Sequence, residues 1–186
     1  MIIGIAGTLG AGKGTVVRYL ESHGFAHFSS SDVLRRILTE RGQEHSRLNT
    51  SNLANELMST YEGGVLHFSN EYARAENYQN FILEALHRVS EGEYIKKIGG
   101  IILGIDADIK VRYERAVVRK EGLKDEVTFE QFEEDSKRED EGMTGTGPNI
   151  KAVIKMADYT ITNNGNLDEL HTQIDIFLEK YANRHN

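Results

Sequence analysis

The chain has 186 residues, which suits one α/β domain, and its 39% hydrophobic and 27% charged residues are ordinary for a globular protein. The net charge of −7 argues against binding along a nucleic-acid backbone, and the absence of cysteine excludes disulfides, thiolate catalysis and cysteine-bound zinc. No apolar run approaches the roughly 18 residues that span a bilayer, and no secretory signal is recognisable, so we expect a cytoplasmic protein without a membrane partner.

A glycine-rich loop follows the first predicted strand, residues 1–6. Its glycines let successive backbone N–H groups converge on phosphate oxygens, and Lys13 adds a positive charge between the β- and γ-phosphates. Residues 13–23 predict a helix whose N-terminus points its free N–H groups at the anion. The segment therefore predicts a phosphate-binding loop for ATP. We expect the nucleotide contacts to come from Gly7, Leu9, Gly10, Ala11, Gly12, Lys13, Gly14 and Thr15.

The loop departs from the usual G-x-x-x-x-G-K-[ST] motif at one position. Gly14 stands where the magnesium-binding hydroxyl normally lies, and Thr15 follows one residue later, so direct metal binding by Thr15 is left open. The G-K-G-T spelling resembles the loop of adenylate kinases and related nucleoside monophosphate kinases, with Leu9 where those enzymes usually carry proline. The resemblance implies a kinase that uses ATP and Mg²⁺.

Further strands are predicted at residues 26–29, 80–84, 100–105 and 159–162, with helical patterns between all of them. Because parallel strands need crossover connections, this alternation predicts a parallel sheet covered on both faces. We expect an α/β, three-layer P-loop NTPase fold with a five-stranded parallel sheet, formed by a single P-loop kinase domain. Its predicted parts are a core of residues 1–31, 80–119 and 157–186, an acceptor-binding helical insertion of residues 32–79, and a short lid region of residues 120–156.

Two short helices are predicted in the lid region, over residues 128–139 and 149–156. Thr128 followed by Gln131 has the spacing of a capping box, which places a helix start there. The glycine-rich residues 142–147 between the two helices fit a mobile hinge and an ordinary loop equally well.

Asp32 and Arg35 follow the second strand in the segment S-S-S-D-V-L-R. This segment is similar to the adenylate-kinase segment that ends in G-D-x-L-R. In that family the arginine binds the acceptor monophosphate and the aspartate lies near the magnesium and its waters, so the resemblance implies those roles here. The alternative is that Asp32 or Ser31 caps a helix while Arg35 lies on a solvated face.

The third strand ends in F-I-L-E-A-L-H-R, which resembles the F-L-L-D-G-F-P-R motif of the same kinases. By that match, Glu84 takes the place of the carboxylate that orders magnesium-bound water, and Arg88 that of an arginine on the acceptor phosphate. Ala85, Leu86 and His87 replace glycine, an aromatic residue and proline, so we expect an acceptor side unlike that of a standard adenylate kinase. We expect His87 to be a pocket wall or surface residue, because phosphoryl transfer needs little base catalysis.

Arg112, Arg115 and Arg119 recur at helix spacing after the fourth strand, which by itself is typical of a solvated helix face. Kinases of this class place one arginine at the end of this helix and another in the lid helix to clamp the donor phosphates. The resemblance therefore implies that Arg119, which would also contact the nucleotide, and Arg138 close over the transferring group.

The last strand leads into Asn163-Asn164-Gly165, which suits a tight turn and a rim around adenine alike, and we expect Asn164 to contact the nucleotide. Residues 157–170 resemble the A-D-x-x-I-x-N-x-G-x-L-x-E-L ending of dephospho-CoA kinases and deoxynucleoside monophosphate kinases. A group of archaeal adenylate-kinase-like proteins shares this ending.

These features together predict a kinase that moves the γ-phosphoryl of Mg-ATP to the phosphate of a nucleoside or deoxynucleoside monophosphate. Its expected catalytic residues are Lys13, Asp32, Arg88, Arg119 and Arg138. The acceptor is expected to contact Asp32, Arg35, Glu84 and Arg88. Magnesium, mostly through water, is expected to contact Thr15, Glu84 and Asp32.

Two alternatives stay open. The chain could be a dephospho-CoA kinase, in which the acceptor is a ribose hydroxyl and Asp32 is the general base. It could also be a nucleotide-binding switch or assembly ATPase without a small-molecule acceptor. We expect a small-molecule nucleotide as partner, no nucleic acid, and a monomer or homodimer.

Overall fold

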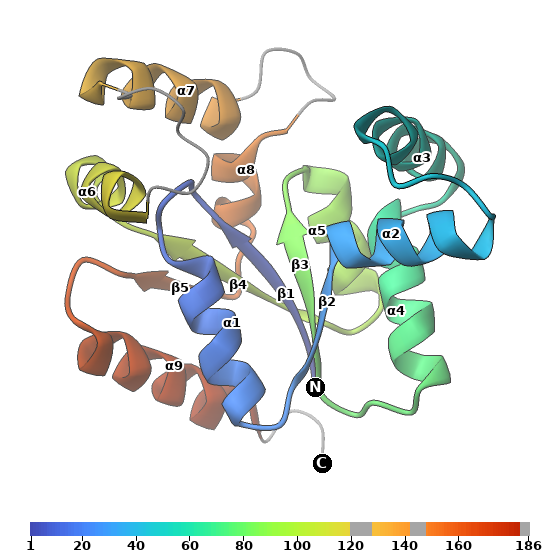
Figure 1. Cartoon of the computed structure of the whole chain (residues 1–186). Helices are drawn as coiled ribbons and strands as arrows, with labels where there is room; N and C mark the ends of the chain where they lie inside the picture. Colours follow the sequence, from blue (N-terminus) through green and yellow to red (C-terminus); the bar gives the residue numbers. More distant parts are fainter. Residues whose placement is uncertain (120–127, 142–147, 183–186) are drawn as a thin grey trace.

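The computed structural model describes residues 1–119, 128–141 and 148–182. Within these ranges, five parallel strands form one sheet in the order β2-β3-β1-β4-β5 (Figure 1). The predicted five-stranded sheet is confirmed, and every strand starts and ends within two residues of its predicted position. The strands are β1 (Ile2–Gly7), β2 (Ala26–Ser29), β3 (Phe81–Leu86), β4 (Ile101–Asp106) and β5 (Tyr159–Thr162).

Helices alternate with the strands and cover both faces of the sheet, which gives the expected three layers (Figure 1). The helices are α1 (Lys13–Ser22), α2 (Ser30–Glu40), α3 (Arg47–Thr60), α4 (Val65–Ala75), α5 (Val89–Lys97), α6 (Ile109–Arg119), α7 (Phe129–Glu141), α8 (Ile150–Lys155) and α9 (Leu167–Ala182).

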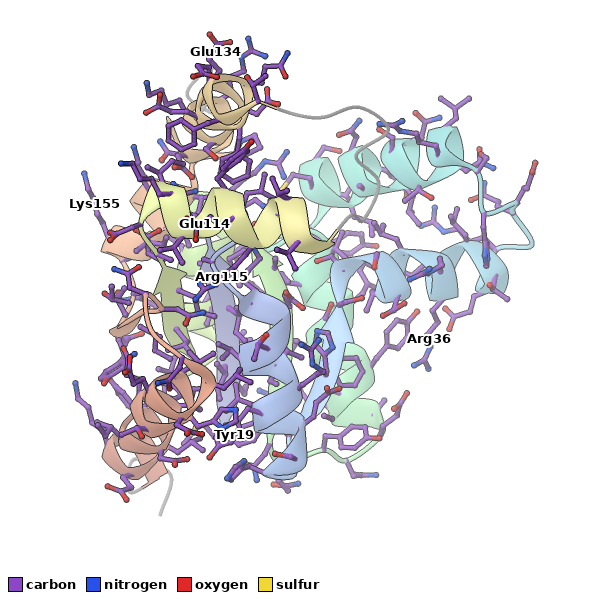
Figure 2. All side chains as sticks on the ribbon, turned by 60° about the vertical axis from the view of Figure 1, so that its left-hand side comes forward. Tyr19, Arg36, Glu114, Arg115, Glu134 and Lys155 are labelled. Atoms are coloured by element: carbon purple, nitrogen blue, oxygen red, sulfur yellow. The ribbon has the colours of Figure 1, made fainter. Side chains whose placement is uncertain are left out.

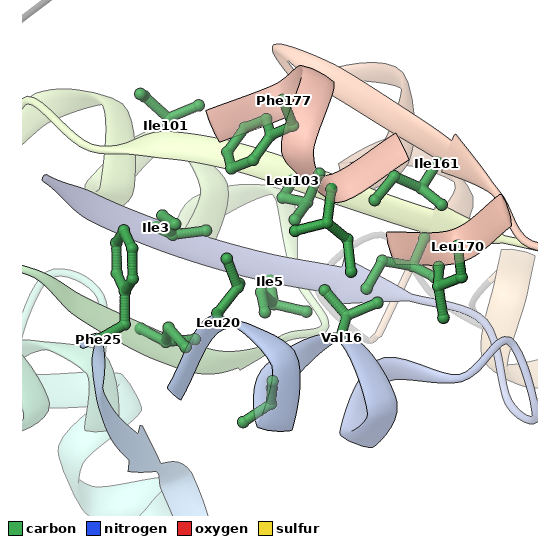
Figure 3. Close-up of a cluster of buried hydrophobic side chains, with 14 of the residues drawn as sticks. Ile3, Ile5, Val16, Leu20, Phe25, Ile101, Leu103, Ile161, Leu170 and Phe177 are labelled. Carbon is green, nitrogen blue, oxygen red and sulfur yellow. The ribbon is translucent and has the colours of Figure 1, made fainter. Parts of the chain in front are cut away.

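Each face of the sheet has its own apolar cluster. On one face, Leu20 of α1 and Phe177 of α9 pack against Ile5 and Leu103, all of them fully buried (Figure 3). On the other face, side chains of α4, α5 and α8 pack against the alternate residues of the same strands. Successive strand residues point to opposite faces, so a strand covered on both sides needs a nearly continuous apolar run. This is why the central strands could be predicted from short apolar segments.

The predicted helical insertion contains α2, α3 and α4, which share a separate apolar cluster. Its buried side chains include Leu38 of α2, Leu57 of α3 and Val65 of α4. Leu66 and Ala73 of α4 also reach the cluster on the sheet. The insertion is therefore anchored to the sheet by α4, while α2 and α3 extend from it (Figure 1).

The capping box predicted in the lid region is confirmed. The Thr128 N–H donates to the Gln131 side chain at 3.1 Å, and the Gln131 N–H donates back to the Thr128 hydroxyl at 3.3 Å. The following helix, α7, contacts α6, where Tyr113 meets the ring of Phe132. The glycine-rich residues 142–147 lie outside the described residues.

The second helix predicted for the lid, α8, lies instead against the sheet. Val153 is fully buried in the cluster that contains Ala6 and Ile102. The predicted lid region of residues 120–156 therefore extends one helix too far, and we assign α8 to the core. Among the described residues, no helix is both long and apolar enough to cross a membrane.

Candidate functional site

The phosphate loop, residues 7–15, connects the end of β1 to the start of α1. Its backbone has φ values of 78° at Gly10 and 100° at Gly12, a region that L side chains rarely adopt. A Cβ on Gly10 would lie 2.6 Å from the Arg112 carbonyl oxygen, and one on Gly12 would lie 2.5 Å from the Asn163 amide. No side chain caps α1, so no side chain competes with an anion for the N–H groups of its first turn, of which that of Thr15 donates to the Gly12 carbonyl at 3.0 Å.

Lys13 lies across the loop that precedes it. Its Nζ donates to the carbonyl oxygens of Gly7, at 2.8 Å, and Thr8, at 3.2 Å. These bonds hold the ammonium group beside the loop, where phosphate oxygens can replace the carbonyl partners. The Thr15 hydroxyl accepts a bond from Arg18 at 3.2 Å, so metal binding by Thr15 stays a prediction.

The first half of the loop is fixed by the end of β4. The Thr8 hydroxyl, which is buried, donates to Oδ1 of Asp106 at 2.8 Å. The same carboxylate oxygen accepts the N–H of Ala107 at 2.9 Å. Asp106 is thus a loop-positioning residue, which the sequence did not indicate because the contact joins residues 98 positions apart.

Two further elements hold the loop carbonyl groups. Arg112 of α6 donates to the Leu9 carbonyl at 3.4 Å, and the Asn163 amide donates to the Ala11 carbonyl at 2.8 Å. Arg115 in turn donates to the Asn163 carbonyl at 2.7 Å. Because these carbonyl groups are bonded outward, the concave side of the loop is left to its N–H groups. Helix spacing alone predicted a solvated face for Arg112 and Arg115, and no sequence pattern indicated this role for Asn163.

A cleft of about 530 Å³, here called the donor cleft, opens beside the phosphate loop. Its walls combine apolar side chains of α6 and α9 with polar groups of the loop and the turn after β5; Glu114 and Arg115 of α6 are labelled in Figure 2. The lining residues are Gly12, Thr15, Glu114, Arg115, Val118, Asn163, Gly165, Asn166, Leu167 and Leu170.

Asn164 does not line the donor cleft, contrary to expectation. Its side chain accepts the N–H of Asp108 at 2.8 Å and so fixes the turn against the start of α6. Its neighbours Asn163 and Gly165 line the cleft instead. The tight turn was predicted, but the pattern of the three residues could not indicate which of them points toward a ligand.

Glu84, at the end of β3, pairs with a histidine of the neighbouring strand. The Nε2 atom of His27 lies 2.9 Å from Oε2 of Glu84, and both side chains are about one-fifth exposed, at 20% and 18%. The imidazole N–H is poorly aligned for a hydrogen bond, so the contact acts mainly as an ion pair. Contact with the Glu84 carboxylate raises the pKa of His27. The sequence did not indicate His27, which lies on another strand.

Asp32 and Arg35 lie together at the start of α2. Ser29 caps this helix by accepting the Asp32 N–H at 3.1 Å, so neither Asp32 nor Ser31 is the cap. The Asp32 carboxylate accepts the Ser29 hydroxyl at 2.5 Å and pairs with Arg35. The Ser29 hydroxyl, and then the Arg35 charge, hold the pKa of Asp32 below its ordinary value. Both side chains are exposed, which keeps them accessible to a ligand.

Arg88 precedes α5, and its Nη1 lies 3.8 Å from the buried carboxylate of Glu91. Glu91 accepts the N–H groups of His87 and Arg88, at 2.6 Å and 3.0 Å, while burial raises its pKa. The pKa of His87 is lowered by desolvation and then by the charges of Lys13 and Arg88. As a whole residue His87 is exposed to solvent, and its place on a pocket wall stays a prediction.

Of the two predicted clamp arginines, only Arg138 has a side chain within the described residues. Arg138 is 63% exposed and pairs with Glu134 and Asp135 of its own helix. Glu134 lies on the outer side of α7, at the top of Figure 2. Arg119 ends α6, and its side chain lies outside the described residues. Their roles at the transferring group remain predictions.

Magnesium fits this site only together with phosphate oxygens. Among the described residues, no group of three or more His, Cys, Asp or Glu side chains is placed to hold a metal ion. Glu84 and Asp32 each offer a carboxylate, which suits Mg²⁺ and its waters, but both are engaged with His27 or Arg35. The residues present therefore fit an ion that arrives with the nucleotide and is contacted through water.

Comparison with known proteins agrees with this geometry. The family profile described as "AAA domain" matches residues 3–144. A UPF0200 protein of Sulfurisphaera tokodaii is 30% identical over 182 residues, which cover 96% of each chain. A UPF0200 protein of Methanococcus maripaludis is 28% identical and covers 98% of each chain.

Solved structures resemble the chain over almost its whole length. A protein from Thermus thermophilus superposes with a TM-score of 0.63 at 20% identity, covering 97% of each chain. A shikimate kinase from Bacteroides thetaiotaomicron gives a TM-score of 0.60 at 11% identity, covering 98% of each chain. At these identities the likeness shows the fold alone. It confirms a P-loop kinase-like fold, while the resemblance to nucleoside monophosphate kinases in particular stays a prediction.

Proposed function

The chain belongs to the AAA domain family and to the UPF0200 proteins, and from that premise we propose that it is an ATP-dependent kinase acting on a nucleoside or deoxynucleoside monophosphate. The observation that carries the proposal is the phosphate loop. Its glycines, its uncapped helix N-terminus and Lys13 form a cradle for phosphates, and it adjoins a cleft of about 530 Å³. This volume lies in the usual range for small-molecule sites.

The donor nucleotide is assigned to the phosphate loop and the donor cleft. Lys13 exchanges its bonds to loop carbonyls for bonds to the β- and γ-phosphates. The base rests between the exposed apolar side chains of Val118 and Leu167, which are 80% and 59% exposed. Binding removes their apolar surface from water, which stabilises the complex.

The acceptor is assigned to the side of the loop formed by β2, β3 and α2. A phosphate oxygen of the acceptor attacks the γ-phosphorus, and the bond to the β–γ bridging oxygen breaks, which releases ADP. Arg35 and Arg88 position the acceptor, and Asp32 and Glu84 orient magnesium-bound water. The chemistry that Mg²⁺ supplies when bound is neutralisation of charge on the donor phosphates.

A hydroxyl acceptor, as in dephospho-CoA kinase, is the weaker assignment. It requires Asp32 as general base, and a base is most effective when its pKa is close to the working pH. The pKa of Asp32 is instead lowered by Ser29 and Arg35. These contacts favour an ionised carboxylate that orders water over one that takes up a proton.

The proposal is tested by ADP formation with a panel of acceptors. Purified protein is mixed with Mg-ATP and, separately, with ribo- and deoxyribonucleoside monophosphates and dephospho-CoA. We expect at least one monophosphate to stimulate ADP formation strongly over ATP alone. Stimulation only by dephospho-CoA would reverse the assignment of the acceptor group. Equal ADP formation with and without every acceptor would instead support a nucleotide-binding switch or assembly ATPase.

A further inference from the structure

A second groove, of about 430 Å³, lies between α2 and α3 and is here called the α2–α3 groove. It is lined by cationic or polar side chains and one alanine, without a carboxylate and without Phe, Tyr or Trp. The lining residues are Ser31, Arg35, His45, Arg47, Thr50, Ser51 and Ala54. Such a lining offers charge and hydrogen-bond donors to an anion.

Arg47 is the unusual member of this set. Every other arginine whose side chain the structure describes bonds to, or is ion-paired with, a protein group. Arg47 has no such partner within residues 1–119, 128–141 and 148–182, and its side chain is exposed. A neighbouring carboxylate therefore does not neutralise it.

The position of Arg47 does not serve the stability of its helix. Arg47 is the first residue of α3, directly after the cap Ser46, which accepts the Asn49 N–H at 3.1 Å. The N-terminus of a helix carries partial positive charge, so a cation there is disfavoured and an anion is favoured. Both the side chain and the helix terminus thus present positive charge at this end of the groove.

Arg35 provides the facing charge from α2. It pairs with Asp32 in a contact where both side chains are more than half exposed, at 54% and 67%. Exposed pairs of this kind are weak, and Asp32 keeps the Ser29 hydroxyl as a partner when Arg35 leaves. Arg35 can therefore turn to an anion in the groove. His45 is held beside it through a 2.8 Å contact with Thr39.

We propose that the α2–α3 groove binds the phosphate group of the acceptor between Arg35 and Arg47. Ser51 supplies a hydroxyl donor on the α3 side of the same group, and Thr50, whose hydroxyl donates to the Ser46 carbonyl at 2.8 Å, lines the same wall. The inference rests on the proposed function in that it names where the acceptor phosphate is held. It adds Arg47 to Arg35 and Arg88, the two arginines already assigned to the acceptor.

The groove is tested by NMR titration of the whole protein with inorganic phosphate, AMP and adenosine. Inorganic phosphate should shift the amide signals of Thr50 and Ser51, which report on the α2–α3 groove. It should also shift those of Gly12 and Lys13, which report on the phosphate loop, so binding at each site is measured separately. AMP should also move the Thr50 and Ser51 signals, whereas adenosine, which lacks the phosphate, should not. If the Thr50 and Ser51 signals stay in place with phosphate and AMP, the inference is wrong.

Two substitutions test whether phosphate binding in the groove depends on Arg47. Arg47→Gln should weaken phosphate binding at Thr50 and Ser51 by about tenfold to a hundredfold, the usual effect of losing a hydrogen bond to a charged group. Its effect on the Gly12 and Lys13 signals should be small. Arg41→Gln is the matched control, because Arg41 lies in the same insertion but pairs with Glu56 outside the groove. Equal phosphate affinity in Arg47→Gln and the unaltered protein would overturn the assignment.

Failure of this inference differs from failure of the proposed function. If a monophosphate stimulates ADP formation and Arg47→Gln leaves its KM unchanged, the kinase assignment stands and the acceptor phosphate lies elsewhere. If no acceptor stimulates ADP formation but Thr50 and Ser51 respond to phosphate, the anion site stands and the kinase assignment fails.

Discussion

At the scale of single residues, the ion pair between His27 and Glu84 changes how the end of β3 is understood. Glu84 was expected only to order magnesium-bound water, but its carboxylate also neutralises a histidine of the adjacent strand. In the proposed function, the carboxylate that orders magnesium-bound water is therefore the one that contacts His27. Substitutions at Glu84 should separate the effect of its charge from that of its length.

Glu84→Gln keeps the length of the side chain and removes its charge, whereas Glu84→Asp keeps the charge and shortens the chain. We predict that Glu84→Gln lowers kcat by about tenfold to a hundredfold, the usual loss when a residue that orients metal ligands is substituted. A high magnesium concentration should partly restore kcat. Glu84→Asp should lose far less. Full activity in both variants, with an unshifted magnesium optimum, would make Glu84 a structural residue.

The same pair predicts a pH dependence of stability. The pKa of His27 in the folded protein is raised above its ordinary value of 6.5, so protonated His27 stabilises the fold. This contribution is complete below the unfolded pKa and is lost as the pH rises through the folded pKa. His27→Gln should therefore lower the free energy of unfolding more at about pH 6 than at about pH 9. Urea unfolding checks this; an equal loss at both values would rule out a charged His27.

At the scale of elements, α6 connects the lid helix to the phosphate loop. Arg112 is 8% exposed and lies 3.8 Å from the Asp140 carboxylate of α7, while its other end reaches the Leu9 carbonyl. The Nε atom of Arg112 and the hydroxyl of Ser136 are buried and have no hydrogen-bond partner within the part of the chain that the structure describes. A buried charge with incomplete partners is costly to disturb, so the position of α7 and the shape of the loop should depend on each other.

Arg112→Ala tests this connection. Removing the cation leaves the Asp140 charge buried beside a gap, which should cost about 3 kcal/mol of stability and raise the KM for ATP through the released Leu9 carbonyl. Lys137→Ala on α7, the helix that carries Asp140, is the control, because Lys137 is 61% exposed and its pair with Glu133 should be worth less than about 1 kcal/mol. Equal effects in chemical unfolding would show that burial of the Arg112 pair is unimportant.

The sequence predicted elements better than it predicted contacts between them. Strands and the phosphate loop are encoded locally. Apolar runs mark the strands, and glycines mark the loop, because a Cβ on Gly10 or Gly12 would clash with a neighbouring residue. The residues that bond to the loop are not encoded locally, because Asp106, Arg112 and Asn163 lie on elements far along the chain. The assignment of α8 to the lid failed because helical periodicity shows that one face is buried but not which surface covers it.

At the scale of the whole molecule, the phosphate loop adjoins the donor cleft, and the α2–α3 groove is a separate cavity. The donor cleft is built by α6, α9 and the turn after β5, and the α2–α3 groove is built by the helical insertion. The insertion and the α6–α7 pair stand on opposite sides of the strand ends in Figure 1. A two-substrate reaction at the loop requires such an arrangement, because each substrate must reach it from its own side.

This separation predicts that arginine substitutions affect one substrate at a time. Arg115→Ala should raise the KM for ATP, because Arg115 lines the donor cleft and supports Asn163. Arg35→Ala should raise the KM for the acceptor by about tenfold or more and leave the KM for ATP nearly unchanged. Initial rates with each substrate varied in turn provide the measurement. If either variant changes both KM values equally, the two regions are not independent.

The central claim is that the γ-phosphoryl group moves from Mg-ATP to a small molecule and not to water. ³¹P NMR of one reaction with the best monophosphate acceptor tests this directly. We predict that ADP and a new diphosphate of the acceptor appear in equal amounts, with little inorganic phosphate, and that Lys13→Ala slows both by about 10²- to 10³-fold with an unchanged melting temperature. Formation of ADP and inorganic phosphate alone, at the same rate with and without acceptor, would contradict the account.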